Sequence, residues 1–306
     1  MRNAGILTAL GLCALLGAGC SQHYNGERLY WKAQQLQAAL SRHLSDATPE
    51  QFAEAIGAYQ AVVSRTPGTV WAARSQAAIG SLYAVQQEFA KAREAYVLVL
   101  QNYGQYHELA LMVRVAIAKT HELESEWEQA VKMYQEISSY HPWSRMGMEA
   151  PLYIAMLHEK RQEAGKAAQA YERAARQYTK LAPDAPTPEY AIQVKGYLAL
   201  AYQRLEKWEQ AINVLEELSG IPTGVNRPLT LLTLATIYQT KAGHPDKAMA
   251  LYTKLADEFP EHPFGKVAKA QLDRLRLPDG GELPAGLSGS DALPQAPVVP
   301  AVPAPR

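Results

Sequence analysis

Cysteine, net charge and long hydrophobic runs are all scarce in this sequence of 306 residues. It contains two Cys, which excludes a disulfide framework. The 30 Lys and Arg are balanced by 30 Asp and Glu, so no net positive charge attracts the chain to nucleic acid. The body of the sequence has no apolar run of roughly 18 residues that could span a membrane.

Motifs that carry chemistry are also missing. The sequence has no glycine-rich phosphate loop and no nucleophile elbow. His107, His121 and His158 are each followed by Glu, but none continues into the HExxH pattern of zinc proteases. No Cys pair or cluster of His and carboxylates has metal-ligand spacing. We therefore expect a non-catalytic protein with no cofactor, no metal and no small-molecule substrate.

The N-terminus has the pattern of a secretory signal. Arg2 precedes an apolar run from about Ile6 to Leu16, which is too short to span a membrane. The small residues Gly17-Ala-Gly then lead into Cys20. This motif resembles a bacterial lipobox, although Gly17 stands where lipoboxes usually have a branched apolar residue. The alternative is a plain signal peptide that happens to contain Cys20.

The lipobox resemblance implies a membrane anchor. Cys20 would carry fatty acyl chains such as palmitate and become the first residue of the mature chain. Each buried acyl carbon contributes about 0.8 kcal/mol, so a multiply acylated Cys is a stable anchor. In bacterial lipoproteins an Asp beside this Cys retains the protein in the inner membrane, whereas Ser21 implies the periplasmic face of the outer membrane. We expect a signal peptide over 1–19 and a lipidated linker over 20–26.

Two short patterns recur along the body of the chain. The first has a branched apolar residue, then Gly or Ala, and an aromatic residue or His three positions later; it occurs at Ile79–Tyr83, Ile117–His121, Ile154–His158, Leu198–Tyr202 and Leu234–Tyr238. The second begins with Ala and ends in Tyr or Leu; it occurs at Ala55–Tyr59, Ala92–Tyr96, Ala130–Tyr134, Ala167–Tyr171, Ala211–Leu215 and Ala248–Tyr252. The ends of the second pattern lie 37, 38, 37, 44 and 37 residues apart. The single long step coincides with a proline-rich insertion at 182–188.

This spacing resembles the tetratricopeptide repeat, a helix–turn–helix unit of about 34 residues. The resemblance implies an all-α, right-handed α-solenoid of about six helix pairs over 27–277. We place the pairs at about 27–67, 70–105, 107–143, 146–181, 187–221 and 227–261, followed by a capping helix at about 263–277. Thr48 and Thr187, each followed by Pro, are expected to cap helix starts, and Pro228 suits another start. Pro151 predicts a helix that begins late or kinks.

Small residues of the repeats predict close helix packing. Gly80 and its equivalents in the first pattern should allow the two helices of a pair to approach, and the leading Ala of the second pattern should do the same between pairs. The Tyr residues should fill the remaining space. His121 and His158 occupy the same packing slot, so we interpret them as half-buried packing residues, and Glu122 and Glu159 as solvated.

In this repeat family the first helices line an inner groove that binds ligands. Helical spacing places nine residues of this chain on the groove side: Val115, Lys119, Leu152, Met156, Glu159, Leu200, Gln203, Thr236 and Gln239. For Leu152 and Leu232 the alternative is packing against the next repeat. Family members that clamp a terminal carboxylate have Lys, Asn and Arg where this chain has Ala77 and Ser81. The expected ligand is therefore an apolar or helical segment of a partner protein.

The last segment, 278–306, is rich in Pro and Gly and has no aromatic residue. We therefore expect a disordered tail, which is a ligand for a partner, a spacer or dispensable.

Lipobox and repeats together resemble the tetratricopeptide lipoproteins of Gram-negative envelopes, which include the lipoprotein subunit of the β-barrel assembly machinery. The resemblance implies a scaffold for an envelope complex, with protein partners and a membrane contact through lipid. The alternative is a pilotin-like or cell-division adaptor that binds a secretin or a cell-wall synthase.

Overall fold

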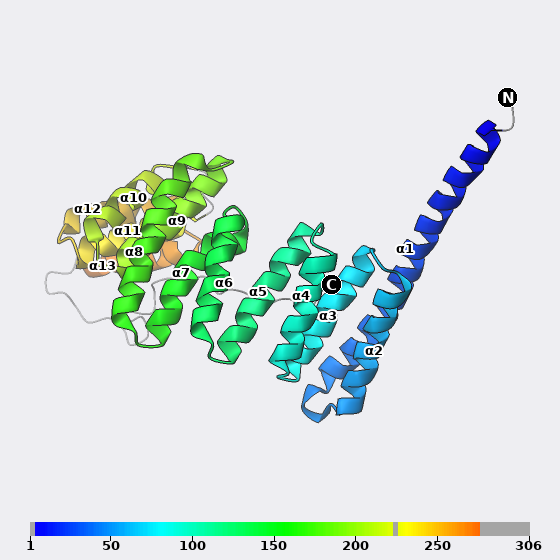
Figure 1. Cartoon of the computed structure of the whole chain (residues 1–306). Coiled ribbons are helices and arrows are strands. Elements are labelled where there is room, and N and C mark those ends of the chain that lie inside the picture. Colours follow the sequence, from blue (N-terminus) through cyan, green and yellow to red (C-terminus); the bar gives the residue numbers. More distant parts are fainter. Residues whose placement is uncertain (1–3, 223–225, 276–306) are drawn as a thin grey trace. The chain divides into compact units, whose positions relative to one another are not determined.

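The computed structural model describes residues 4–222 and 226–275, with side chains from residue 23 onward (Figure 1). Over these ranges every regular element is helical. The chain divides into two compact units, one ending at Ile137 and the other beginning at Ser138, and each is described by itself. The predicted tail over 278–306 lies outside the described residues, and no described helix is long and apolar enough to cross a membrane.

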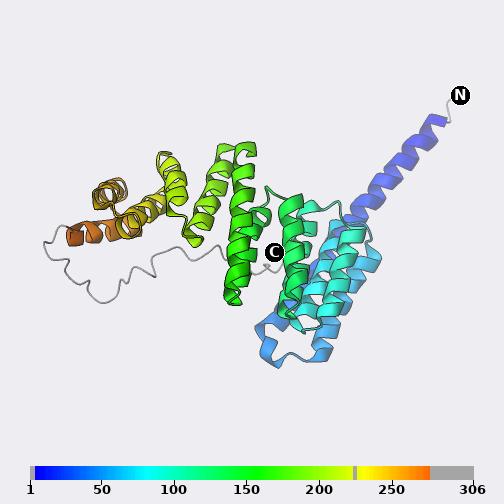
Figure 2. The ribbon, with the colours of Figure 1, turned by 60° about the vertical axis from the view of Figure 1, so that its left-hand side comes forward.

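The first unit contains α1 to α5 and most of α6. The bounds of its helices are α1 (Ala4–Arg42), η1 (Leu44–Asp46), α2 (Pro49–Arg65), α3 (Val70–Val85), α4 (Phe89–Asn102), α5 (His107–Leu123) and α6 (Trp127–Tyr140). Helices that follow one another in the sequence lie side by side, and α1 also contacts α3 (Figures 1 and 2). The first half of α1 extends past the other helices of the unit (Figure 1). Its backbone stays helical across the predicted linker over 20–26.

The second unit repeats the same arrangement. Its helices are α7 (Arg145–Lys160), α8 (Ala164–Leu181), η2 (Ala182–Asp184), α9 (Pro188–Arg204), α10 (Trp208–Ser219), α11 (Arg227–Thr240), α12 (Pro245–Glu258) and α13 (Pro263–Leu275). The proline-rich insertion forms η2, which packs against α8 and α9. The predicted fold class, an all-α solenoid of tetratricopeptide-type helix pairs with a capping helix, is confirmed for the described residues.

Local signals explain where the helices begin. Thr48 caps α2 by accepting a hydrogen bond from the Gln51 backbone N–H, and the Gln51 side chain accepts one from the Thr48 N–H at 2.9 Å. Thr187 stands at the cap of α9 without a capping bond from its side chain. The late start expected from Pro151 is wrong, because Ser144 caps α7 through the Gly147 N–H and the helix continues through the proline.

The core of both units joins small residues to buried tyrosines. In the first pattern Gly80 is buried, and a Cβ placed on it would lie 2.5 Å from the Tyr96 ring. Four of the equivalent positions are Ala with 1 % exposure or less: Ala118, Ala155, Ala199 and Ala235. The tyrosines of the second pattern are buried as well: Tyr59, Tyr96, Tyr134, Tyr171 and Tyr252. This core explains the repeat, because only small residues leave room for the tyrosine rings between closely approaching helices.

Candidate functional site

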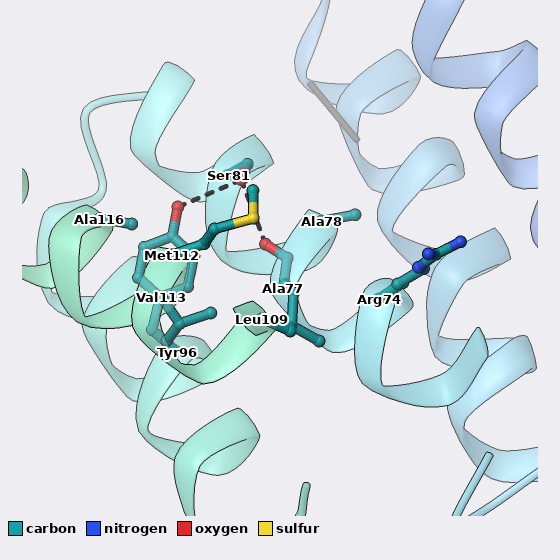
Figure 3. Close-up of a pocket in the computed structure, with 9 residues that line it drawn as sticks. All are labelled: Arg74, Ala77, Ala78, Ser81, Tyr96, Leu109, Met112, Val113 and Ala116. Atoms are coloured by element: carbon teal, nitrogen blue, oxygen red, sulfur yellow. Dashed lines mark hydrogen bonds between the residues drawn. The ribbon is translucent and has the colours of Figure 1, made fainter. Parts of the chain in front are cut away.

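A recess opens between α3 and α5, over α4, within the first unit (Figure 3). Its volume is about 370 Å³, including the open mouth. Nine residues line it, and we call them the α3–α5 recess: Arg74, Ala77, Ala78, Ser81, Tyr96, Leu109, Met112, Val113 and Ala116. Six of these side chains are apolar. The recess therefore offers mainly hydrocarbon surface to a ligand.

The recess exists because the facing helices carry small side chains. Ala77 and Ala78 come from α3, and Ala116 comes from α5. At the position equivalent to Ala77, the next two repeats carry Val115 and Leu152, and both of these are buried. Ala77 is thus smaller than the residues at the equivalent position in these two repeats, although Gly196 at that position in α9 is smaller still. Met112 lies at the recess with about a third of its surface (36 %) still exposed.

One hydrogen-bond chain supplies the polar character of the recess. The Ser81 hydroxyl donates to the Ala77 carbonyl at 3.2 Å, and it lies 3.2 Å from the Tyr96 hydroxyl (Figure 3). A hydroxyl has one proton to donate, so in this arrangement Tyr96 donates to Ser81 and its own oxygen can only accept. Burial raises the pKa of Tyr96, so the hydroxyl stays protonated at neutral pH. A ligand can therefore place an N–H or O–H donor here.

Arg74 marks the edge of the recess. Its guanidinium lies 5.3 Å from the centre of the Trp71 ring, which is a cation–π contact. Figure 3 shows this side chain turned away from Tyr96 and Ser81. In the ranges that the structure describes, no ion pair to Arg74 is found. The guanidinium is therefore directed toward Trp71 and away from the polar groups of the recess.

The predicted groove residues have several different environments. Val115 and Leu152 were expected in the groove but are 4 % and 0 % exposed, so this prediction is wrong for both. Leu232, for which packing was the alternative, is also buried, with 5 % of its surface exposed. Met156 and Leu200 are half-buried.

The five polar residues of the predicted groove bind neighbours within the chain. Lys119 forms an ion pair with Glu122 at 3.0 Å, and Gln203 donates to the Ala199 carbonyl at 3.2 Å. Thr236 donates to the Leu232 carbonyl at 2.9 Å. Glu159 and Gln239 accept hydrogen bonds from tyrosines, as described below. These contacts restrict the side chains, while each polar group keeps further donor or acceptor capacity that a ligand could use.

Tyrosines of the second helices donate to the first helices in several repeats. The acceptor lies one position after the aromatic residue or His of the first pattern: Tyr134 donates to Glu122 at 2.5 Å, Tyr171 to Glu159 at 2.8 Å and Tyr252 to Gln239 at 2.8 Å. Glu122 and Glu159 were expected to be solvated. This is wrong for Glu122, whose side chain is 8 % exposed, whereas the Glu159 side chain stays 48 % exposed while it accepts the Tyr171 hydroxyl. The recurring carboxylate or amide beside the packing slot was the sequence signal for this contact.

The two packing-slot histidines are half-buried, as expected. His121 Nδ1 lies 2.6 Å from Glu126, and His158 Nδ1 lies 2.7 Å from Glu163. Both carboxylates stand just before or at the cap of the following helix, so each pair ties the turn within a repeat to its first helix. In the described part of the chain no three His, Cys, Asp or Glu side chains gather as metal ligands do.

Comparison with known proteins identifies the repeats. Two family models described as tetratricopeptide repeat match residues 198–229 and 230–262. No curated protein matches the sequence. Similar solved structures include YrrB, a tetratricopeptide-repeat protein with an unusual peptide-binding site (13 % identity, 70 % of this chain and 99 % of that chain, TM-score 0.39).

Two further similar structures are those of PilF and PilW. One is PilF of Pseudomonas aeruginosa (14 % identity, 81 % and 99 % of the two chains, TM-score 0.37). The other is PilW, a type IV pilus biogenesis factor (11 % identity, 80 % and 98 %, TM-score 0.40). Tetratricopeptide repeats are protein-interaction modules. Residues 198–262 thus carry tetratricopeptide repeats, and the chain has the helical-repeat architecture of a protein-binding scaffold.

Proposed function

We propose that this protein is a lipid-anchored adaptor of a Gram-negative outer membrane that binds an apolar segment of a partner protein in the α3–α5 recess. The recess carries the proposal. It combines a floor formed by Ala77, Ala78 and Ala116 with an exposed Met112 and one acceptor oxygen on Tyr96. An apolar side chain of the partner would displace water from the floor, while a donor on the same segment meets the Tyr96 oxygen.

The anchor rests on the N-terminal sequence. Cys20 follows Gly-Ala-Gly, and Ser21 stands where an Asp would retain a bacterial lipoprotein in the inner membrane. A helical-repeat scaffold held at the periplasmic face suits the assembly of an envelope complex. We name the β-barrel insertion machinery as that complex, because its lipoprotein subunit shares the combination of lipobox and tetratricopeptide repeats.

Lipidation is tested by metabolic labelling with an alkyne-bearing palmitate in a Gram-negative host. The full chain should incorporate label and fractionate with outer membranes. The Cys20→Ser variant should lose the label, whereas a Ser21→Ala variant should keep it. Label that persists in Cys20→Ser would refute the anchor.

The binding site is tested by crosslinking in cells. A photoreactive amino acid replaces Met112 in one variant and Val97 in the other. Val97 is a matched control, because its 39 % exposure is close to the 36 % of Met112 but it does not line the recess. Capture of a β-barrel insertion protein from position 112 alone supports the proposal. A captured secretin or cell-wall synthase would contradict the named complex, and equal capture from both positions would contradict the recess.

A further inference from the structure

Helix α1 has two faces of different chemistry over its described side chains. Gly26, Tyr30, Ala33 and Leu40 are buried. At about 100° per residue, the exposed residues Tyr24, Arg28, Trp31, Gln35 and Arg42 fall within an arc of about 60° on the opposite side. A helix that packs on one side is expected to be polar on the other. Here two aromatic rings lie on the solvent side, and we call these five residues the outer face of α1.

The inner face fixes the orientation of α1. The Tyr30 ring lies between those of Tyr59 and Trp71, with centroids 5.8 Å and 5.4 Å away. Gly26 fits tightly, since a Cβ there would lie 2.9 Å from the Trp71 ring. The helix therefore has little freedom to rotate and bury its outer aromatics. Tyr24 and Trp31 therefore stay exposed, because the packing of Tyr30 and Gly26 fixes which side of α1 faces the core.

The exposure of Trp31 is unusual within this chain. Its exposed fraction is 59 %, and that of Tyr24 is 66 %. The remaining four tryptophans are half-buried: Trp71, Trp127, Trp143 and Trp208. Trp and Tyr on one side of a helix are characteristic of the membrane–water interface, where the ring lies among the headgroups and its polar atom meets water.

The charge around these aromatics fits an anionic surface. Between 23 and 42, α1 carries Arg28, Lys32 and Arg42 but only one acidic residue, Glu27. All four are exposed, and in the described residues none of them belongs to an ion pair. Long basic side chains beside Trp and Tyr are typical of helices that lie on anionic lipid headgroups.

The position of the outer face along the chain supplies the last argument. Cys20 precedes Tyr24 by four residues and Trp31 by eleven, about 6 Å and 16 Å along a helix. The backbone is continuously helical over this stretch. Lipid attached at Cys20 would therefore hold the outer face within reach of the bilayer. A single acyl chain binds weakly, and a second contact of this kind strengthens an anchor.

We propose that the outer face of α1 is a membrane-docking surface that lies on anionic headgroups beside the lipidated Cys20. The proposal rests on the lipid anchor of the proposed function. Docking at this surface would hold the first unit against the membrane, instead of leaving it tethered by the acyl chains alone.

The test uses the full chain, processed and lipidated in a Gram-negative host. Trp31→Cys supplies a free thiol for an environment-sensitive nitrobenzoxadiazole label, since acylation blocks Cys20 and processing removes Cys13. Tyr140→Cys is the matched control, because Tyr140 is an exposed aromatic residue of α6. Each labelled protein is reconstituted into vesicles of phosphatidylethanolamine and phosphatidylglycerol. Emission is recorded with and without headgroup-level quencher lipids.

The expected result is a blue shift and strong quenching of the label at position 31, with neither change at position 140. Adding Arg28→Glu and Lys32→Glu should reduce both effects in these anionic vesicles. Equal emission at the two positions in an acylated protein would overturn the docking surface and leave the anchor intact. A shift that depends on protein concentration in detergent micelles would indicate a second copy instead and also overturn it. An unacylated chain would refute the anchor and the docking surface together.

Discussion

At the scale of single residues, the tyrosine hydroxyls link the two helices of a repeat. Tyr171 is 4 % exposed and donates to Glu159 at 2.8 Å, and Arg204 lies 3.3 Å from the same carboxylate. In the next repeat Leu215 replaces the tyrosine, and Gln203 turns to the backbone of its own helix. The position is therefore mainly a packing position, which an aliphatic side chain such as Leu215 can also fill, and the tyrosine hydroxyl adds one hydrogen bond to it.

Removing one of these hydroxyls should have a measurable cost. We expect Tyr171→Phe to lower the free energy of unfolding by about 1 kcal/mol, because one hydrogen bond is lost while the ring stays packed. Tyr140→Phe is the control, since Tyr140 is exposed and surface changes usually stay within about 0.5 kcal/mol. Urea unfolding followed by circular dichroism measures both. Equal stability of the two variants would show that the hydroxyl contributes nothing.

Gly80 provides a second residue-scale prediction. Adding a methyl group in Gly80→Ala forces the Tyr96 ring away, because the new Cβ would lie 2.5 Å from it. We expect a loss of about 1–3 kcal/mol from overpacking. Gly196→Ala should instead stabilise α9 by about 0.5–1 kcal/mol, because nothing lies within 4 Å of a Cβ there. Thermal unfolding of the two variants should shift in opposite directions, and a destabilised Gly196→Ala would contradict the account.

At the scale of elements, the turn inside five of the helix pairs, from α3–α4 to α11–α12, has a recurring backbone conformation. Gln87, Ser125, Gln162 and Glu206 have φ between 55° and 62°, and Gly243 has φ of 67° in the last pair. These residues follow the first helix of their pair, and their left-handed backbone conformation ends that helix. A side chain in this conformation is strained by roughly 1 kcal/mol relative to Gly.

Replacing such a residue by glycine should relieve the strain. We expect Gln162→Gly to raise the free energy of unfolding by up to about 1 kcal/mol, less the greater freedom that Gly gives the unfolded chain. The reverse change, Gly243→Ala, should lower it by a similar amount. Differential scanning calorimetry of the pair gives the comparison. A lower melting temperature for Gln162→Gly would contradict this assignment of strain.

The helix pairs could be predicted from the sequence because their spacing is set by small residues that recur in register. The recess could not, since its existence depends on differences between repeats. Ala77 leaves space where Val115 and Leu152 fill it, and periodicity alone assigns all three to the same groove. The contact of Tyr134 with Glu122 could not be predicted for a related reason. A Glu near a helix end is usually solvated, and the sequence alone does not show that a tyrosine of the next helix reaches it.

At the scale of the whole molecule, ionisation of several groups ties stability to pH. The pKa values of Glu50, Glu163 and Glu189 lie below the usual 4.5, chiefly through a backbone hydrogen bond, His158 and Thr187 respectively. A lowered folded pKa adds stability above pH 4.5 that is lost as the pH falls further. Burial raises the pKa of several tyrosines above 10.0: Tyr30, Tyr59, Tyr96, Tyr171, Tyr178, Tyr197 and Tyr252. The protonated tyrosines therefore contribute to the stability of the folded protein below pH 10.0, and this contribution is lost as the pH rises further.

The protein should therefore be most stable between these limits. We expect the urea midpoint to fall below about pH 4.5 and again above about pH 10, with the tyrosinate absorbance of the buried tyrosines appearing only as the chain unfolds. Glu163→Gln should weaken the acid dependence, because it removes one of the three carboxylates. Ionisation of all 17 tyrosines in a chain that is still folded would contradict the burial of these hydroxyls.

The central claim is that the α3–α5 recess binds the partner, and the amount of partner retained by two matched variants tests it most directly. Met112→Glu places a charge on the recess, whereas Val97→Glu places one on a similarly exposed position outside it. Each is purified with its complexes from outer membranes, and the β-barrel insertion proteins are quantified by mass spectrometry. We predict that Met112→Glu loses these proteins while Val97→Glu retains them at the level of the unmodified chain. Full retention by a folded Met112→Glu variant would contradict the claim.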